Sequence, residues 1–364
     1  SGREEKKLGI DGSSTTALML EDCQVPVENV LGEIGRGHKI AFNVLNIGRL
    51  KLGARSVGAI KLSLGQSVSY AKERHQFGQP IANFGLIKHK LAEMAIRAYV
   101  GESILYRTAG MIDQALESVN KDDPQRVLAV LEQYAGECSI IKVWVSEALG
   151  YVVDEEVQVF GGYGYSKDYP AERAYRDARI ARIYEGTSEI NRIVIGSQLL
   201  RRARSGDLGI LAGAVSVSGA GREGTLGPLA DERKILGDAK RVALASFGLV
   251  DKAYGDGFRD QQEILGHIAD IVVDIYTMES ALLRTEALIG QRGEAQSRVQ
   301  TDITRVYIRD AAARIERAAS VIENEISVEG DSIVTGRMHQ APIQAIAARR
   351  RIADSMITAG RYNL

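Results

Sequence analysis

The sequence has few cysteines and almost no excess of charge, and each shortage excludes a class of protein. Its two cysteines, Cys23 and Cys138, lie far apart and outside any CxxC pattern, so we expect neither a disulfide framework nor a zinc knuckle. A reducing compartment fits this cysteine usage best. The formal net charge of -1 argues against general nucleic-acid binding, which needs a basic excess or a basic stripe. Small molecules or proteins are therefore the expected partners.

Long apolar runs and several catalytic motifs are also absent. No run approaches the roughly 18 to 20 apolar residues that span a bilayer, and no signal-peptide pattern stands at the start. The sequence has no HExxH zinc motif, no Walker P-loop and no GxSxG elbow, and no histidine follows a glutamate by three positions as in di-iron bundles. These absences argue against a metallohydrolase, a nucleoside triphosphatase and a serine hydrolase, and we predict no metal site.

The hydrophobic pattern divides the chain into four regions and predicts a mainly α fold. Residues 1–35 contain a short β-like run at Thr15–Leu20 and resemble the end of a β domain. Residues 36–205 show long helical periodicities with short connections, which is typical of an antiparallel helical bundle. One apolar face contains Val57, Ile60, Leu64 and Val68, and separate helices are expected over about residues 124–149 and 151–160. Residues 206–227 are rich in glycine and predict a linker. Residues 228–364 return to helical periodicity and predict a second helical domain, with apolar faces at Ile264, Ile268, Ile271 and Ile275 and at Ile308, Ala312, Ile315, Ala319 and Ile322.

The first region contains a strand without partners. The strand expected at Thr15–Leu20 needs partners for its backbone groups, and nothing later in the chain offers an equivalent set. Together with a start at Ser-Gly rather than Met, this predicts missing sequence upstream.

In the linker, the letters of Gly219–Gly224 match a dinucleotide fingerprint. We reject that match because Gly227 and Pro228 follow and only helices are predicted downstream.

The segment Ile183–Ile190 is the most informative part of the sequence, because it places a carboxylate on a glycine turn directly before a helix. Thr187 is a predicted N-cap, and Glu189 is a first-turn acid that suits the helix dipole. Glu185 therefore points out of the helix start, which is a good place for a catalytic base. Gly186 allows a ligand close to the backbone and offers a free amide. Taken alone, the segment also fits an ordinary solvated loop acid.

Two further segments combine groups that suit an anionic, ring-bearing cofactor. Arg74–Ile81 joins two long helices and contains a cation, an aromatic ring and a tight turn, although an ordinary helix connection fits it as well. Gln158–Tyr165 is a helix end that runs into a glycine turn, where bare amides can meet an anion. Each signal is weak by itself.

In this order and at these separations, the segments resemble the acyl-CoA dehydrogenase family of flavoproteins. The resemblance extends from about residue 6 to residue 203, and the helical region after residue 205 resembles the extension of the very-long-chain branch. The segments that carry it are Lys6–Gly9, Val25–Gly32, Gly48–Arg49, Arg74–Ile81, Asn83–Ile87, Gln158–Gly164 and Ile183–Arg192.

The resemblance implies a role for each matching residue. Glu185 matches the base that removes the α proton of an acyl thioester while flavin N5 accepts a hydride from the β carbon, and the amide after it resembles a donor to the thioester carbonyl. Contacts with the adenine-dinucleotide part of a neighbouring subunit's FAD fall to Arg74, Gln76, Phe77, Ile81, Gln158 and Gly162. Contacts with the subunit's own FAD fall to Thr187 and Glu189, and contacts with acyl-CoA fall to Asn46, Arg49, Tyr184 and Gly186. An FAD shared in this way implies a homodimer or a higher oligomer.

The sequence departs from the family pattern at a few positions. Glu189 and Gly85 stand where many relatives have glutamine, so those two flavin contacts differ here. Some branches place the base at the position of Gly48, and since glycine cannot act as a base, Glu185 is the sole candidate by this matching. The family's N-terminal helical domain and most of its β domain have no counterpart in the sequence. We therefore expect an incomplete part of the enzyme that binds FAD poorly and is inactive alone.

The sequence thus predicts an FAD-dependent acyl-CoA dehydrogenase of fatty acid β-oxidation that converts long-chain acyl-CoA into trans-2-enoyl-CoA. The resemblance also implies an electron-transferring flavoprotein as acceptor, and a bacterial cytoplasm or the matrix side of the mitochondrion as location. The alternative is a dehydrogenase-like scaffold or assembly protein. Peripheral membrane contact is a further hypothesis, since Arg201, Arg202 and Arg204 precede the apolar stretch 208–217. A solvated helix end followed by a docked loop fits that stretch too.

Overall fold

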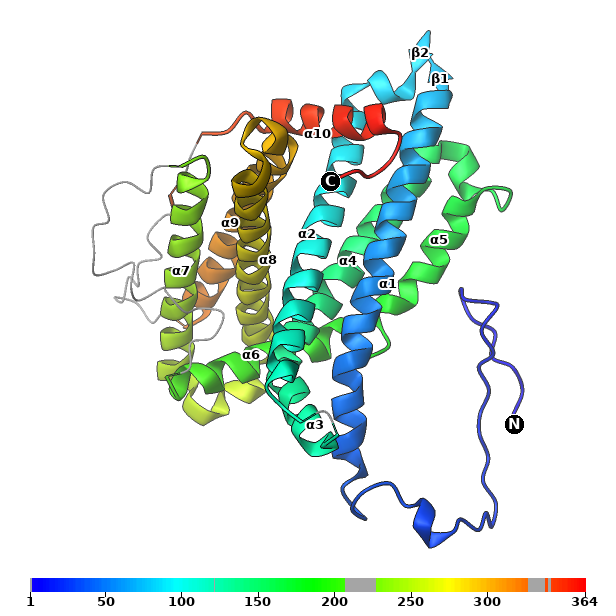
Figure 1. Ribbon diagram of the computed structural model, residues 1–364, viewed down its shortest axis with the longest axis vertical. Coiled ribbons are helices and arrows are strands. Elements are labelled where there is room, and N and C mark those ends of the chain that lie inside the picture. The colour runs from blue at the N-terminus through cyan, green and yellow to red at the C-terminus, as the bar shows by residue number, and fades with distance from the viewer. Residues whose placement is uncertain (1, 121, 207–226, 327–337, 340–341) are drawn as a thin grey trace.

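The structure is a computed structural model that describes residues 2–120, 122–206, 227–326, 338–339 and 342–364, and these are mainly helical (Figure 1). The long helices of the first half are α1 (Gly37–Glu73), α2 (Gly85–Glu117) and α4 (Ala135–Phe160). Shorter helices are α3 (Pro124–Gln133), α5 (Pro170–Ala178) and α6 (Ser188–Arg204), with 3-10 turns η1 (Val27–Asn29), η2 (Ile81–Asn83), η3 (Gly161–Tyr165) and η4 (Arg179–Arg182). The second half contains α7 (Ala230–Tyr254), η6 (Gly255–Asp260), α8 (Gln262–Arg292), η7 (Ala295–Ser297), α9 (Arg298–Ile326) and α10 (Ala345–Ala359).

The first unit is a bundle in which α1, α2 and α4 all pack against one another (Figure 1). The face of α1 predicted from the sequence is buried, and its members are Val57, Ile60, Leu64 and Val68. Burying each such side chain contributes roughly 1.5 to 3 kcal/mol. The mainly helical class and the amphipathic faces that produce it are therefore confirmed.

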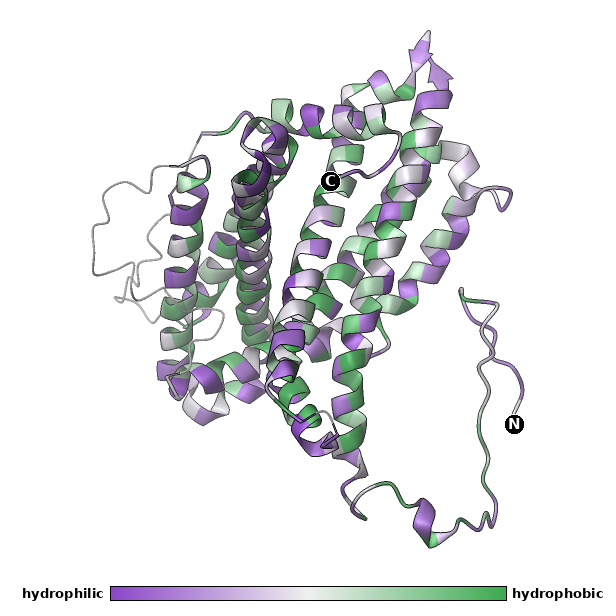
Figure 2. Cartoon of the chain, viewed as in Figure 1, coloured by the Kyte–Doolittle hydropathy of each residue, from purple (hydrophilic) through white to green (hydrophobic). Residues whose placement is uncertain are grey.

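The second helical unit packs against the first rather than standing apart. Helix α8 lies against α9, α7 and α6, and α2 contacts both α8 and α10. Its predicted apolar faces are buried, at Ile264, Ile268, Ile271 and Ile275 on α8 and at Ile308, Ala312, Ile315, Ala319 and Ile322 on α9. One continuous hydrophobic cluster runs through both units, and Figure 2 shows hydrophobic residues alternating with polar ones along the helices of both.

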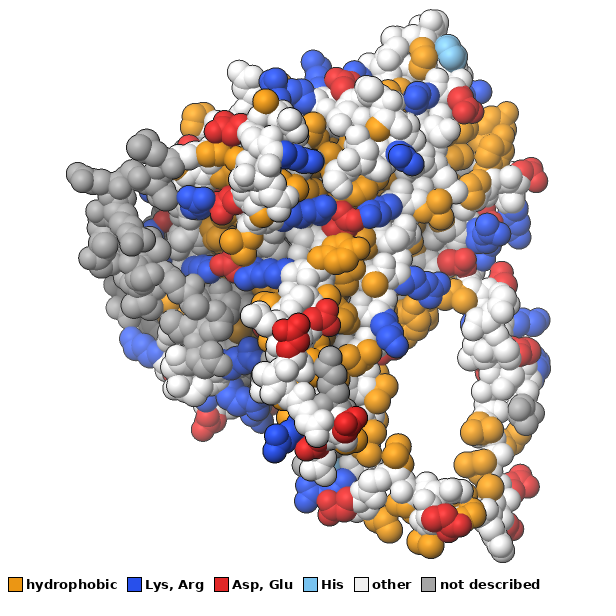
Figure 3. Space-filling view, viewed as in Figure 1, with side chains coloured by type: hydrophobic (Ala, Val, Ile, Leu, Met, Phe, Trp, Pro, Cys, Tyr) orange, Lys and Arg blue, Asp and Glu red, His pale blue; other side chains and the backbone are white. Residues whose placement is uncertain are grey.

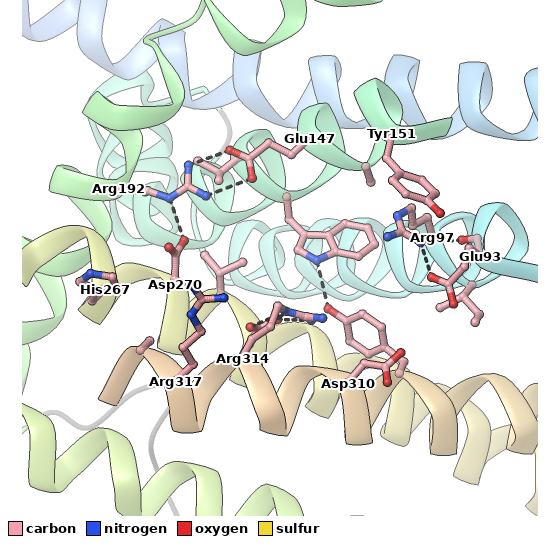
Figure 4. A pocket seen from close by; sticks show the side chains of 18 of the residues that line it. Glu93, Arg97, Glu147, Tyr151, Arg192, His267, Asp270, Asp310, Arg314 and Arg317 are labelled. Atoms are coloured by element: carbon pink, nitrogen blue, oxygen red, sulfur yellow. Dashed lines mark hydrogen bonds and ion pairs between the residues drawn. The ribbon is translucent and has the colours of Figure 1, made fainter. Parts of the chain in front are cut away.

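Charged groups line a cavity of about 580 Å³ between the two units (Figure 4). Arg192 of α6 donates to Glu147 at 2.7 Å and to Asp270 at 2.7 Å. Trp144 donates its indole N–H to the Tyr307 hydroxyl at 3.0 Å. Because most of these charges are paired with one another, we interpret this cavity as part of the contact between α4, α6, α8 and α9.

Three expectations about local structure are corrected. The strand expected at 15–20 is not formed, and within residues 2–36 the backbone makes only two hydrogen bonds of a strand-like kind, from Gly2 N to Ala17 O and from Glu5 N to Thr15 O. A lone extended segment lacks the neighbours that complete a ladder. Helix α4 also continues through Gly150 to Phe160, and the break lies at Tyr134 instead. A Cβ at Gly150 would make an ordinary van der Waals contact, 3.4 Å from the Arg182 guanidinium, so packing does not require glycine there.

The third correction concerns the connection from α1 to α2, which is a β-hairpin with strands β1 (His75–Gln76) and β2 (Gln79–Pro80). Phe77 and Gly78 form its tip with φ values of 51° and 81°, the left-handed pair that a two-residue hairpin turn requires. The predicted glycine-rich linker falls on residues outside those described, apart from Gly206 and Gly227.

Candidate active site

Glu185 lies in a tight turn between η4 and α6, with backbone strain at the residue itself. Its φ is 58°, and the next residue, Gly186, has a φ of 85°. Glycine adopts this left-handed conformation freely, but for glutamate it costs about 1 to 2 kcal/mol. Such a conformation persists only where the surrounding structure holds it, and this is often at a functional site.

Buried donors from three helices hold the carbonyl groups of this turn. Arg49 of α1 donates from Nε to the Glu185 carbonyl at 3.2 Å. Lys142 of α4 donates from Nζ to the Arg182 carbonyl at 3.1 Å. Asn191 of α6 donates from Nδ2 to the Gly186 carbonyl at 2.8 Å and to the Thr187 carbonyl at 3.0 Å. These hydrogen bonds explain how a glutamate keeps a left-handed backbone here.

The start of α6 completes the turn, as the sequence predicted. Thr187 is the N-cap, and its hydroxyl accepts a hydrogen bond from the Ile190 amide at 3.3 Å. Glu189 follows in the first turn, and its pKa is lowered by its own backbone amide and by the Thr187 hydroxyl. The Gly186 amide makes no backbone hydrogen bond within the described part of the chain, so it remains able to donate to a ligand.

The Glu185 carboxylate lies directly over Gly48 of α1. A Cβ at position 48 would lie 2.5 Å from Glu185 Oε2, so there is no room for a side chain beneath the carboxylate. Oε2 is buried, and none of the described residues hydrogen-bonds it. A carboxylate oxygen without a protein donor is free to accept a proton from a ligand.

Asn46 and Arg49, which the resemblance links to CoA, are both buried, with exposed fractions of 5% and 7%. Arg49 Nη1 donates to Asn46 Oδ1 and to Ser139 Oγ, each at 3.2 Å. Burial lowers the pKa of Arg49, while Cys138 and Glu185 oppose that shift. Arginine stays protonated through such a shift. Arg49 therefore supports the backbone of the Glu185 turn, and Asn46 accepts a hydrogen bond that helps to hold Arg49 in position.

Tyr184 lies beside a cavity of about 230 Å³ that runs between α1, α4 and α5. Its hydroxyl accepts a hydrogen bond from Arg55 Nη1 at 3.4 Å. Ser56, Ala59 and Val153 contribute to the walls. This cavity places a partly apolar space next to the carboxylate turn.

Most of the predicted adenine-dinucleotide contacts lie together at the other end of α1. Arg74, Gln76, Ile81 and Gly162 line one hollow of about 1040 Å³. Gln158 is not among its lining residues, and Phe77 stands at the hairpin tip with 90% of its surface exposed. Sequence reasoning missed the tyrosines that line the same hollow, although they cluster around its glycine turn: Tyr70, Tyr163 and Tyr169.

Aromatic faces and a cation meet in this hollow. The Arg74 guanidinium lies 5.8 Å from the centre of the Tyr163 ring, and Tyr70 stacks on Phe160 with ring centres 4.2 Å apart. Such groups suit a phosphate-bearing, ring-bearing ligand. The hollow and the Glu185 turn are separate sites, because Arg49 and Arg74 are about 37 Å apart along α1 at about 1.5 Å per residue.

The site also contains residues that sequence reasoning missed. Ser139, Lys142 and Asn191 support the Glu185 turn through bonds to Arg49 or to backbone carbonyls. Lys142 had a detectable signal, since it is a single charge within the apolar run Cys138–Val145. The partner of each donor depends on tertiary contact and was not predictable from spacing.

The described residues contain neither a membrane-spanning helix nor a cluster of metal ligands. Among them, no helix is long and apolar enough to cross a bilayer, and no three His, Cys, Asp or Glu side chains converge as metal ligands would. The membrane hypothesis loses part of its basis, because Arg204 binds Asp251 and Asp256 and Arg202 donates to the Gln133 carbonyl. The apolar stretch 208–217 lies outside the described residues.

Comparisons with known proteins agree on one family. Two family profiles, both described as "Acyl-CoA dehydrogenase, C-terminal domain", match residues 35–200 and residues 238–338. A probable acyl-CoA dehydrogenase of Bacillus subtilis is 41% identical over 379 residues, which cover 100% of this chain and 64% of that protein. The very long-chain specific acyl-CoA dehydrogenase of Rattus norvegicus is 33% identical, covering 89% of this chain and 50% of that protein.

Solved structures give the same result. The crystal structure of an acyl-CoA dehydrogenase complexed with FAD from Bacillus anthracis is 41% identical with a TM-score of 0.92, and the match covers 100% of this chain and 64% of that one. Acyl-CoA oxidase 1 of Yarrowia lipolytica shares the fold with a TM-score of 0.75 at 14% identity, covering 99% of this chain and 57% of that one. The chain thus spans less than two thirds of the length of these relatives.

Proposed function

Since the chain belongs to the acyl-CoA dehydrogenase family through its C-terminal domains, we propose that it supplies the catalytic base for FAD-dependent α,β-dehydrogenation of acyl-CoA thioesters. The base is Glu185. The observation that carries this proposal is the Glu185 carboxylate itself, which is held over Gly48 by a strained turn with one buried oxygen free of protein donors.

Different residues at the turn accept the proton, stabilise the developing charge and hold the backbone in place. Glu185 accepts the α proton of the thioester, and the bond that held this proton provides the electron pair of the new double bond. The Gly186 amide donates to the thioester carbonyl and stabilises the negative charge that develops on its oxygen. Arg49, Lys142 and Asn191 keep both groups in place through the carbonyls of the turn. Bound FAD supplies the acceptor for the hydride from the β carbon.

The residues present fit FAD at two separate places. Thr187 and Glu189 stand at the Glu185 turn, while Arg74, Gln76, Ile81 and Gly162 stand in the tyrosine-lined hollow. Phe77 and Gln158 complete the proposed set, with Phe77 free at the hairpin tip to meet a second subunit. The distance of about 37 Å between the two places, at about 1.5 Å per residue of α1, supports contacts with two different FAD molecules. We therefore propose a homodimer or higher oligomer of the enzyme, and expect this chain by itself to bind FAD poorly and to be inactive.

The substrate and the acceptor follow from the same family membership. We propose long-chain acyl-CoA, in fatty acid β-oxidation, on the basis of the match to the rat very long-chain enzyme across both helical units. Tyr184 and the cavity beside it suit the acyl group, and Asn46 and Arg49 support the turn beneath it. Electrons pass to an electron-transferring flavoprotein, and we propose the cytoplasm of a bacterium, in line with the Bacillus subtilis relative, or else the mitochondrial matrix side.

The test uses the complete flavin-loaded enzyme that contains this chain, mixed anaerobically with acyl-CoA substrates of increasing chain length. We expect loss of the flavin absorption band with long-chain substrates, and no loss in Glu185→Gln. Glu132→Gln is a matched control, because Glu132 is exposed on α3. Bleaching retained in Glu185→Gln would overturn the assignment. A complete enzyme that binds no flavin would favour the scaffold interpretation.

A further inference from the structure

Lys142 combines complete burial with a position directly behind the catalytic turn. Its side chain is 0% exposed, in the middle of α4. Burying an ammonium group is costly unless it is paired and hydrogen-bonded. Its ammonium group donates a hydrogen bond to the Arg182 carbonyl at 3.1 Å, while Glu147, a nearby carboxylate that favours its charged form, is paired with Arg192 instead. A simple ion pair therefore does not explain why a charge is kept here.

The bond to Arg182 lies at the entry to the Glu185 turn. Arg182 is the last residue of η4, three positions before the base. The carbonyl groups at the end of a helix lack partners within the helix, and a cation stabilises them. The Ile183 and Tyr184 amides both bond back to Ile180, at 2.8 Å and 3.2 Å, so the end of η4 and the start of the turn move together.

The surrounding charges come from α1, α4 and α6. Glu147 of the same helix and Glu189 of α6 favour the ammonium form, whereas Arg49 of α1 and Arg192 of α6 oppose it. Burial is the largest effect, and the pKa of Lys142 is lowered to about 8. The ammonium group is therefore present at neutral pH and loses its proton as the pH rises through about 8.

We propose that Lys142 is a positioning residue for the base, which holds the Arg182 carbonyl and so keeps the turn in the conformation that places Glu185 over Gly48. The inference rests on the proposed function of Glu185 for its catalytic consequence, but not for its structural one. Arg49 and Asn191 hold the turn at and after Glu185, while Lys142 holds the segment that leads into it.

One consequence is a pH-sensitive turn. Above a pH of about 8 the neutral amine remains a donor, but the carbonyl loses its charge-assisted hydrogen bond, which is the stronger kind. The turn therefore loosens on the alkaline side while the helices around it stay folded.

Hydrogen exchange of the full chain, followed by mass spectrometry, tests this without any need for catalysis. In Lys142→Met, a neutral side chain of similar length, exchange in residues 180–191 should be about 10- to 100-fold faster at pH 7 than in the wild type, the factor expected for a hydrogen bond to a charged group. Peptides from α8 and α9 should be unchanged. Lys90→Met is the matched control, because Lys90 is a partly buried lysine of α2 paired with Glu155, away from the turn.

A pH series on the wild type gives a second measurement that holds even if Lys142→Met fails to fold. After correction for intrinsic exchange rates, protection of residues 180–191 should fall as the pH rises from 7 to 9.5, and Lys90→Met should behave in the same way. Unchanged protection in Lys142→Met at pH 7, or protection in the wild type that is constant across the series, would overturn the proposal.

The catalytic arm separates this inference from the proposed function. In the complete flavin-loaded enzyme, Lys142→Met should slow bleaching by acyl-CoA about tenfold or more at pH 7 and by a smaller factor at pH 9.5, where the wild type has lost the charge and keeps only a neutral donor. Faster exchange in Lys142→Met together with bleaching in Glu185→Gln would leave the turn support established and the role of Glu185 refuted. Loss of bleaching in Glu185→Gln with unchanged exchange in Lys142→Met would do the reverse.

Discussion

At the scale of single residues, the position of Glu185 depends on what lies beneath it. Gly48 leaves space for the carboxylate, and a methyl group there would meet Glu185 Oε2 at 2.5 Å. The end of a glutamate side chain can move aside, so the fold tolerates the change while the base is displaced. Activity and stability should therefore respond in opposite directions to a substitution at this position.

We predict that Gly48→Ala stabilises the protein by roughly 0.5 to 1 kcal/mol, because alanine is the better helix residue, and slows flavin bleaching by at least about tenfold, since a displacement of about 1 Å can cost more than that. Thermal unfolding and the rate of bleaching measure the two effects. Gly58→Ala is the control on the same helix, since a Cβ there meets no atom within 4 Å. It should gain stability at full activity, and equal activity in both variants would contradict the geometry.

Glu156 is a second residue whose environment makes a measurable prediction. Its side chain is fully buried on α4, and burial raises its pKa to about 7, while the nearby Ser63 hydroxyl opposes the shift. A folded-state pKa above the unfolded value of 4.5 means that the native protein binds more protons between these two values. The contribution of Glu156 to stability therefore falls as the pH rises from about 4.5 to 7.

Glu156→Gln removes this titration and should stabilise the protein at pH 8 by up to about 3 kcal/mol relative to its effect at pH 4.5, from about 2.5 pKa units at about 1.4 kcal/mol each. Urea denaturation at the two pH values measures the difference. Glu132→Gln, at an exposed site, should show no such dependence. A difference of the opposite sign would show that Glu156 is charged and paired in the native state.

At the scale of elements, the contact between α1 and α4 is close enough to require glycine. A Cβ at Gly53 would lie 2.2 Å from Cγ2 of Ile141, a fully buried β-branched side chain that cannot turn away. We predict that Gly53→Ala destabilises the protein by about 1 to 3 kcal/mol through overpacking, whereas Gly58→Ala stabilises it. Denaturation midpoints of the two variants check this, and equal stability would mean that the helices separate without cost.

Among the helices, features that depend on nearby residues were predictable from the sequence, and features that depend on tertiary contact were not. The apolar faces of α1, α8 and α9 and the N-cap Thr187 were predictable, because periodicity and capping are local properties. The break at Tyr134 and the continuation of α4 through Gly150 were not, because tertiary packing overrides the weak helix propensity of a single glycine.

The candidate site was likewise predictable only in part. The Glu185–Gly186 turn was visible in the sequence, but its left-handed backbone and its supports were not. Those supports, Arg49, Lys142 and Asn191, reach the turn from three helices. Family resemblance indicated the residues of the tyrosine-lined hollow, and only the fold brings them to one place.

At the scale of the whole molecule, the two helical units share one core and leave other surfaces uncovered. Apolar side chains gather along the N-terminal segment and the beginning of α1 in Figure 3, and among them Leu18, Val27, Leu31 and Phe42 are exposed. Exposed apolar surface of this extent marks a contact with another protein surface. The Glu185 turn, the tyrosine-lined hollow and this surface therefore fit the proposed assembly of more than one subunit around FAD.

The central claim is that Glu185 removes the α proton of an acyl thioester. The most direct measurement follows the α hydrogens of an acyl-CoA in D₂O by mass spectrometry, with the complete flavin-loaded enzyme under anaerobic conditions. The account predicts incorporation of deuterium at the α carbon with the wild type and with Glu132→Gln, and none above the uncatalysed rate with Glu185→Gln. Incorporation by Glu185→Gln at the wild-type rate would contradict it.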